Sequence, residues 1–160
     1  MKCVILAGGK GSRLSEYTKI IPKPMVTIGK IPILVHIINY YIKFGFNDFI
    51  VAAGYKHNVI KNYFEKKRIK NFKVRVVNTG IHTLTGKRLK LLEKFFDNET
   101  FFLTYGDGLS NVNLKKLLQF HKKHRKLVTL TAVHPPARFG EIKLKNNIIN
   151  NFIEKPQLVK

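Results

Sequence analysis

The chain has 160 residues, of which 44% are hydrophobic, so it is long enough to bury a sizeable core within one domain. Its single cysteine, Cys3, excludes an intramolecular disulfide and is typical of a reducing cytoplasm. No apolar run approaches the roughly 20 residues of a membrane span, and glycines interrupt the apolar start too early for a signal peptide. We therefore expect a cytoplasmic protein without a membrane partner.

The formal net charge is +21, from 30 basic and 9 acidic residues, and such a balance can indicate a nucleic-acid-binding protein. Here the basic residues are scattered along the chain without an arginine-rich block. Lysine is abundant together with isoleucine and asparagine, as A/T-rich codon usage produces. We therefore expect no nucleic-acid partner, and we expect the charge to attract phosphorylated substrates.

Residues 3–7, Cys-Val-Ile-Leu-Ala, predict a short buried strand that runs into a glycine-rich turn. Backbone N–H groups of Gly8, Gly9 and Gly11 can approach an anion closely, because glycine has no Cβ. Phosphates usually bind where a strand enters such a turn in an α/β sheet. Neither the dinucleotide fingerprint nor the Walker loop matches this spacing. A tight strand-to-helix turn without a ligand remains the alternative.

The next predicted elements follow in chain order. Pro22 and Pro24 hold Lys23 in an extended backbone, which predicts a fixed cation near the turn, with a solvated loop lysine as the alternative. Apolar spacing predicts helices over residues 31–44, 57–67, 88–96 and 112–124. Strands are expected over residues 49–53, 72–77, 100–105 and 127–133, and a hairpin over residues 141–144 and 148–152. This alternation predicts βαβ units and a mainly parallel sheet.

Ligands of such sheets bind at the carboxyl ends of the strands. Three features fall there: the glycine turn, Thr79-Gly80, and Gly106-Asp107-Gly108. Arg88 falls at the expected start of the helix over residues 88–96, where the macrodipole disfavours a cation and a bound anion would relieve the conflict.

Asp107 is the one carboxylate that falls at the carboxyl end of an expected buried strand, and glycines on both sides leave room for a ligand. A carboxylate in such a place suits Mg²⁺, which completes its shell with phosphate oxygens and water. A simple Gly-Asp-Gly turn is the alternative. Together with the glycine turn and the cations Arg13, Lys23 and Arg88, Asp107 suits phosphoryl or nucleotidyl transfer, which needs positioning and charge neutralisation rather than a protein nucleophile.

Leu-Ala-Gly-Gly-Lys-Gly-Ser-Arg-Leu (6–14) with Pro-Lys-Pro-Met (22–25) resembles the opening of the sugar-nucleotide pyrophosphorylases. Within this family the chain looks most like the glucose-1-phosphate cytidylyltransferases. The motifs that carry the closer resemblance are Arg-Leu-Ser-Glu (13–16), Asn-Thr-Gly (78–80), Thr-Gly-Lys-Arg-Leu (85–89), Thr-Tyr-Gly-Asp-Gly (104–108), Pro-Pro-Ala-Arg-Phe-Gly (135–140) and Glu-Lys-Pro (154–156).

The resemblance implies a Rossmann-like three-layer α/β/α sandwich, the nucleotide-diphospho-sugar transferase fold. It implies that CTP and α-D-glucose 1-phosphate are the substrates, that CDP-glucose and pyrophosphate are the products, and that Mg²⁺ is required. Another base (UTP, dTTP or GTP) and a non-catalytic nucleotide-binding relative remain alternatives.

By the same resemblance, Asp107 would bind Mg²⁺, Lys23 would neutralise the phosphates and Lys155 would face the sugar phosphate. Arg13, Lys23 and Asp107 would be the catalytic residues. The residues expected to contact the nucleotide are Leu6, Ala7, Gly8, Gly9, Lys10, Gly11, Ser12, Arg13, Lys23, Thr83, Arg88 and Gly106.

Members of this family continue past their Glu-Lys-Pro motif into a segment with a second metal-binding aspartate. We therefore expect residues 1–160 to form one nucleotidyltransferase domain that supplies the nucleotide-binding part, with the sugar-binding portion outside it. The stretch between Phe64 and Phe72 is shorter than in the cytidylyltransferases, where an insertion helps subunits associate. A homo-oligomer is nevertheless among the expectations.

Overall fold

The computed structural model describes residues 1–11, 18–66, 72–133 and 140–153. The chain divides into two compact units, Met1–Leu118 and Gln119–Lys160. Within the described ranges, no helix combines the length and apolarity that crossing a membrane requires.

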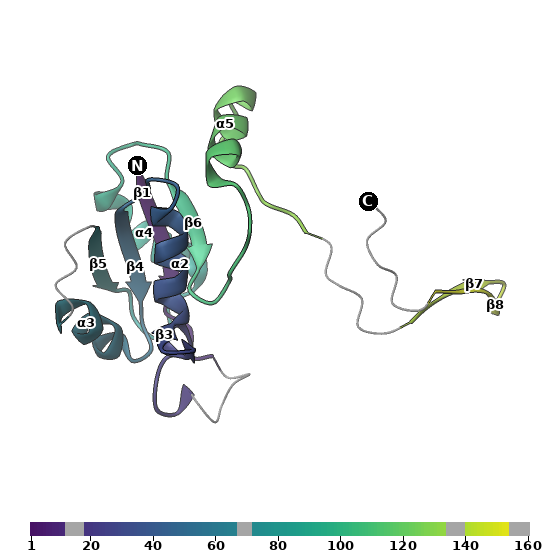
Figure 1. The fold of residues 1–160 in the computed structure, drawn as a ribbon, viewed down its shortest axis with the longest axis horizontal. Helices are drawn as coiled ribbons and strands as arrows, with labels where there is room; N and C mark the ends of the chain where they lie inside the picture. Colours follow the sequence, from purple (N-terminus) through teal and green to yellow (C-terminus); the bar gives the residue numbers. More distant parts are fainter. Residues whose placement is uncertain (12–17, 67–71, 134–139, 154–160) are drawn as a thin grey trace. The chain divides into compact units, whose positions relative to one another are not determined.

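The first unit is built on a four-stranded parallel sheet with the order β5-β4-β1-β6 (Figure 1). The strands are β1 (Lys2–Ala7), β4 (Asp48–Ala53), β5 (Lys73–Asn78) and β6 (Phe102–Tyr105). The first two are nearly continuous apolar runs, because strands covered on both faces carry apolar residues on both sides. The expected mainly parallel sheet is therefore confirmed.

Helices cover both faces of this sheet. The helices of the first unit are α2 (Ile33–Ile42), α3 (His57–Lys66) and α4 (Thr85–Leu91), with 3₁₀ turns η2 (Lys23–Met25) and η3 (Glu93–Phe95). Helix α5 (Leu114–His124) begins in the first unit and continues into the second. Ile5 packs in one core cluster with Leu34 of α2, while Val4 packs in a second cluster with Leu92. Since alternate residues of β1 point to opposite faces, the two clusters lie on opposite sides of the sheet, as the layered α/β fold requires (Figure 1).

Two helix boundaries differ from the sequence-based expectation. The helix expected from residue 31 begins at Ile33, because β3 (Ile31–Pro32) pairs with β2 (Thr27–Ile28). The helix expected from Arg88 begins at Thr85, so Arg88 lies in its last turn and the proposed conflict with the helix N-terminus is wrong. The first turn of α4 is exposed and contains no apolar residue, so apolar periodicity could not reveal it.

Two strand predictions also need correction. The expected buried strand over residues 100–105 is β6, which is only half-buried, since its Leu103 and Tyr105 are 45% and 59% exposed. The prediction of a strand over residues 127–133 is wrong, because these residues form neither a helix nor a strand. A segment with β-propensity forms a strand only when another strand is available to hydrogen-bond with it. Among the described residues of the second unit, the paired strands are β7 and β8, and residues 127–133 are in neither.

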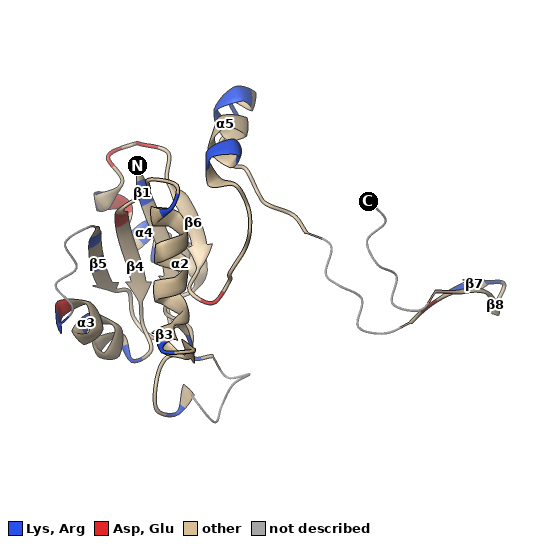
Figure 2. Cartoon of the chain, viewed as in Figure 1, with Lys and Arg blue, Asp and Glu red and all other residues tan. Residues whose placement is uncertain are grey.

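The hairpin prediction is confirmed in the second unit by β7 (Glu141–Lys145) and β8 (Ile148–Ile153), which pair in antiparallel fashion. The turn residues Asn146 and Asn147 have φ of 51° and 63°, the left-handed conformation that two-residue hairpin turns favour. Basic residues occur on several separate elements, among them α3, α5 and β7 (Figure 2). Their positions agree with the scattered charge noted in the sequence.

Candidate functional site

A cavity of about 350 Å³ lies at the carboxyl ends of β1 and β6, where ligands of parallel sheets bind. It is lined by Leu6, Ala7, Gly8, Gly9, Gly11, Lys23, Pro24, Thr83, Leu84, Thr85, Arg88, Tyr105, Gly106 and Asp107. Four segments that are far apart in the sequence therefore contribute to one site.

The glycine turn after β1 forms one wall of this cavity. A Cβ added to Gly9 would meet no atom within 4 Å, so the backbone at this position borders open space that a ligand can enter. The amide of Gly106 donates to the carbonyl of Leu6 at 2.9 Å. A Cβ on Gly106 would lie 3.0 Å from Cγ of Pro24, so glycine there lets the β6 end approach β1 and the η2 turn closely.

Arg88 links the ends of three strands beside the glycine turn. The residue is buried, with only 5% of its surface exposed. The guanidinium donates to the carbonyls of Gly8 at 3.1 Å, Gly80 at 2.8 Å and Ala53 at 3.4 Å, and also to the hydroxyl of Thr79. Burial lowers the pKa of the Arg88 guanidinium below its ordinary value. Because this cation bonds neutral oxygens instead of a carboxylate, it remains a source of positive potential beside the cavity.

Two glycines leave the space that the guanidinium occupies. A Cβ on Gly8 would lie 2.1 Å from Nη1 of Arg88, and a Cβ on Gly54 would lie 2.7 Å from the same atom. Any larger residue at either position would displace the guanidinium. We call this slot, formed by Gly8, Gly54 and the acceptors of Arg88, the arginine slot.

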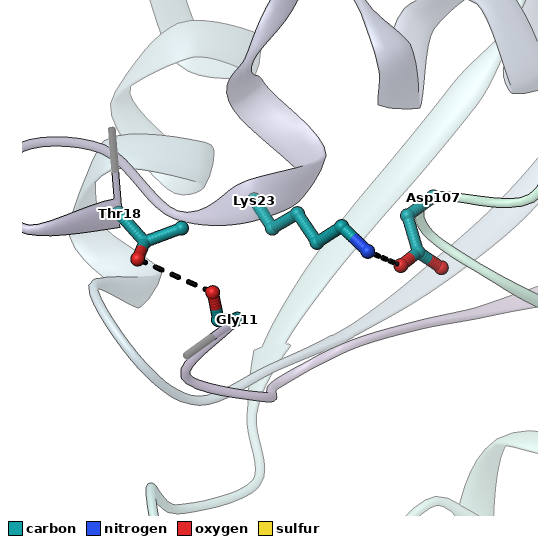
Figure 3. Close-up of polar contacts among 4 residues, drawn as sticks. All are labelled: Gly11, Thr18, Lys23 and Asp107. Atoms are coloured by element: carbon teal, nitrogen blue, oxygen red, sulfur yellow. Dashed lines mark hydrogen bonds and ion pairs between the residues drawn. The ribbon is translucent and has the colours of Figure 1, made fainter. Parts of the chain in front are cut away.

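Lys23 and Asp107 form an ion pair at the cavity, between Nζ and Oδ2 (Figure 3). Lys23 belongs to η2 and Asp107 to the turn after β6, and their side chains are 27% and 34% exposed. The backbone of Lys23 is held because Pro22 and Pro24 flank it and the Met25 amide donates to the Pro22 carbonyl at 2.8 Å. The structure thus places a fixed cation and a single carboxylate side by side, both within reach of a ligand.

Asp107 is the candidate metal ligand. In the described part of the chain, no group of three or more histidine, cysteine, aspartate or glutamate side chains could hold a metal ion by itself. One partly exposed carboxylate on an open cavity nevertheless fits Mg²⁺, which commonly binds through one or two carboxylates together with substrate phosphates.

The cavity brings together most of the site residues predicted from the sequence, namely Leu6, Ala7, Gly8, Gly9, Gly11, Lys23, Thr83, Arg88, Gly106 and Asp107. Lys10 is exposed and does not line it. Ser12, Arg13 and Lys155 lie outside the described residues.

Sequence reasoning missed four lining residues: Pro24, Leu84, Thr85 and Tyr105. Tyr105 belongs to the Thr-Tyr-Gly-Asp-Gly motif, and Leu84 precedes the Thr-Gly-Lys-Arg-Leu motif. Both side chains are large, apolar in most of their atoms, and exposed on the surface. Such exposure of apolar surface at a cavity is a signal for ligand contact that only the structure reveals.

The fold agrees with a family comparison. A model of the nucleotidyl transferase family matches residues 2–160, and the chain belongs to this family. The chain is 43% identical to glucose-1-phosphate cytidylyltransferase from Salmonella typhimurium, over 98% of this chain and 70% of that protein. It is 38% identical to probable glucose-1-phosphate cytidylyltransferase from Bacillus subtilis, over 97% of this chain and 69% of that protein. The resemblance inferred from the motifs is therefore confirmed.

A solved structure supports the fold assignment. The chain matches the structure of a putative glucose-1-phosphate thymidylyltransferase from Bacillus anthracis with a TM-score of 0.73 and 24% identity. The match covers 98% of this chain and 65% of the thymidylyltransferase, so this chain spans just under two thirds of that neighbour's length.

Proposed function

We propose that this chain is the nucleotide-binding part of a glucose-1-phosphate cytidylyltransferase, which forms CDP-glucose and pyrophosphate from CTP and α-D-glucose 1-phosphate with Mg²⁺. The observation that carries the proposal is the convergence of the glycine turn, Lys23 and Asp107 on one cavity at the sheet end. The identity to two proteins named as cytidylyltransferases supports the choice of CTP and glucose 1-phosphate.

Each group would act on the triphosphate by position and charge. The open backbone at Gly9 and Gly11 would accommodate the phosphates, with N–H groups as donors. Lys23 would exchange its ion pair with Asp107 for the phosphate oxygens and offset their charge. Arg88 would keep the glycine turn in shape from the arginine slot and add positive potential.

Asp107 would hold Mg²⁺, which supplies charge neutralisation and orientation at the phosphates when it is bound. In the transfer itself, an oxygen of the sugar phosphate forms a bond to the α-phosphorus of CTP as the bond to the β-phosphate oxygen breaks. The pyrophosphate that leaves carries the electron pair of the broken bond. No protein nucleophile is needed, because the residues position the two reactants and stabilise charge.

The test begins with calorimetric titration of the purified chain with CTP, UTP, dTTP or GTP in the presence of Mg²⁺. Since the chain is proposed to supply the nucleotide-binding part, we expect CTP to bind more tightly than the other three nucleotides. We expect CDP-glucose formation from CTP and glucose 1-phosphate to be slow or undetectable with this chain alone, and to rise when the C-terminal segment of a cytidylyltransferase relative is fused to it. Tighter binding of another nucleotide would overturn the choice of base, and CTP binding without turnover in the fusion would identify a non-catalytic nucleotide-binding relative.

A further inference from the structure

Tyr55 lies in the turn that follows β4 and contacts the glycine turn without lining the cavity. Its backbone amide donates to the carbonyl of Gly8 at 3.2 Å. Its phenolic hydroxyl donates to the carbonyl of Thr18 at 2.9 Å. One residue thus holds two points of the chain that are ten positions apart, since Gly8 opens the glycine turn and Thr18 lies beyond it.

Thr18 passes this constraint on to the wall of the cavity. It is buried, with 4% of its surface exposed, and its hydroxyl donates to the carbonyl of Gly11 at 3.3 Å (Figure 3). Gly11 has a φ of +67°, and a Cβ there would lie 3.0 Å from both Cγ2 of Thr18 and Cβ of Lys23. Thr18 and Lys23 therefore both pack closely against Gly11, and Thr18 also holds its carbonyl.

Lys56 reinforces the same contact. Its ammonium group donates to the carbonyl of Lys19, the residue after Thr18, and lies 5.4 Å from the centre of the Tyr55 ring. Lys56 has a φ of 48°, which is unfavourable for a residue with a side chain. A strained backbone of this kind persists only where the surrounding contacts hold it, and here those contacts connect β4 to the segment at Thr18 and Lys19.

We propose that Tyr55 is a positioning residue for the triphosphate. It holds Gly8 directly and Gly11 through Thr18, and so fixes the glycine turn where the phosphates would bind beside Lys23. This inference rests on the proposed function, because it assigns the role of a residue behind the same site. Tyr55 acts through other residues, so its loss should reduce phosphate affinity without removing any group that contacts the ligand.

The chain offers a matched control for the phenolic hydroxyl. The hydroxyl of Tyr40 donates to the carbonyl of Val112 at 2.8 Å, in the same unit, and Tyr40 does not line the cavity. The variants Tyr55→Phe and Tyr40→Phe each remove one hydroxyl bond to a backbone carbonyl and keep the ring. A purely structural role of Tyr55 predicts the same effects from both substitutions.

The experiment measures melting temperature and the calorimetric dissociation constants of CTP and of inorganic tripolyphosphate, each with Mg²⁺. We expect similar falls in melting temperature for both variants. Only Tyr55→Phe should weaken the binding of both probes, by about fivefold to tenfold, the effect expected when about one hydrogen bond's net free energy is lost from the bound state. Lys56→Met, which removes the bond to Lys19 and keeps most of the side chain, should weaken both probes as well.

Equal probe affinities in Tyr55→Phe and Tyr40→Phe, with normal affinity in Lys56→Met, would overturn the positioning role while leaving the proposed function intact. Tripolyphosphate binding without CTP binding by the unmodified chain would overturn the assignment of the base and would leave the effect of Tyr55→Phe measurable. Binding of neither probe by the unmodified chain would overturn the proposed function together with this inference.

Discussion

The arginine slot predicts that two adjacent glycines will respond to the same substitution in opposite ways. In Gly8→Ala, the new Cβ would lie 2.1 Å from Nη1 and 2.2 Å from Cζ of Arg88. Ordinary contact distances are much longer, so the guanidinium must leave its place. In Gly9→Ala, the new Cβ would have no protein atom within 4 Å and would project into open space.

The expected magnitude follows from the bonds that Arg88 would lose. Hydrogen bonds to a charged group are each worth about 1.5–3 kcal/mol. Losing the bonds to Gly8 and Gly80 should therefore lower the free energy of unfolding of Gly8→Ala by about 3–6 kcal/mol. For a chain of this size that corresponds to a fall in melting temperature of at least about 6 °C. Gly9→Ala should change the free energy of unfolding by less than about 0.5 kcal/mol, but its methyl group should weaken CTP binding.

The assay combines urea and thermal unfolding with a calorimetric CTP titration in both variants. Gly8→Ala should lose stability, and Gly9→Ala should keep stability and lose affinity. A Gly8→Ala protein with an unchanged melting temperature would refute the reasoning, because the guanidinium would then have space to move at no cost.

Three further predictions follow from the charged and buried groups. Asp107→Asn should retain the melting temperature and lose most of the Mg²⁺-dependent part of CTP binding; calorimetry with an unchanged Mg²⁺ dependence would remove Asp107 as the metal ligand. Lys23→Ala should weaken CTP binding with little change in melting temperature, or lower the turnover of an active fusion by about 10²–10³, the usual loss for one preorganised charge-stabilising group; normal CTP affinity together with normal turnover would make Lys23 a solvated loop lysine. Burial raises the pKa of the Cys3 thiol to about 12 and that of the Tyr41 phenol to about 12. Because the unfolded chain releases these protons at lower pH than the folded chain does, stability should fall as the pH rises from about 9 towards 12. Urea unfolding at pH 8 and pH 10.5 checks this, and Cys3→Ala should lose less stability between the two than the unmodified chain; an equal loss would contradict the Cys3 contribution.

The sequence predicted those parts of the fold and site that depend on local pattern. The run from Cys3 to Ala7 is apolar on both faces, so it indicated the central strand, and the glycines after it indicated the turn. Asp107 was identifiable because two glycines flank it after a strand. These features need only a few neighbouring residues to be recognised.

Features that depend on tertiary contacts could not be predicted in the same way. Arg88 lies in the last turn of α4, and its partners Gly8, Ala53 and Gly80 come from three different strand ends. No local pattern reveals that these carbonyls converge. The strand expected over residues 127–133 failed for a related reason, since its composition favours a strand but pairing depends on a partner elsewhere in the chain.

The central claim is that CTP binds at the glycine turn and the end of β6, and an NMR titration of the backbone amides tests it most directly. On addition of CTP and Mg²⁺, the amide signals of Gly9, Gly11 and Asp107 should shift in a saturable manner, and those of Lys2 and Cys3, at the opposite end of β1, should stay in place. Saturable shifts confined to the amino end of β1, or CTP binding that leaves the signals of Gly9, Gly11 and Asp107 unchanged, would contradict the account.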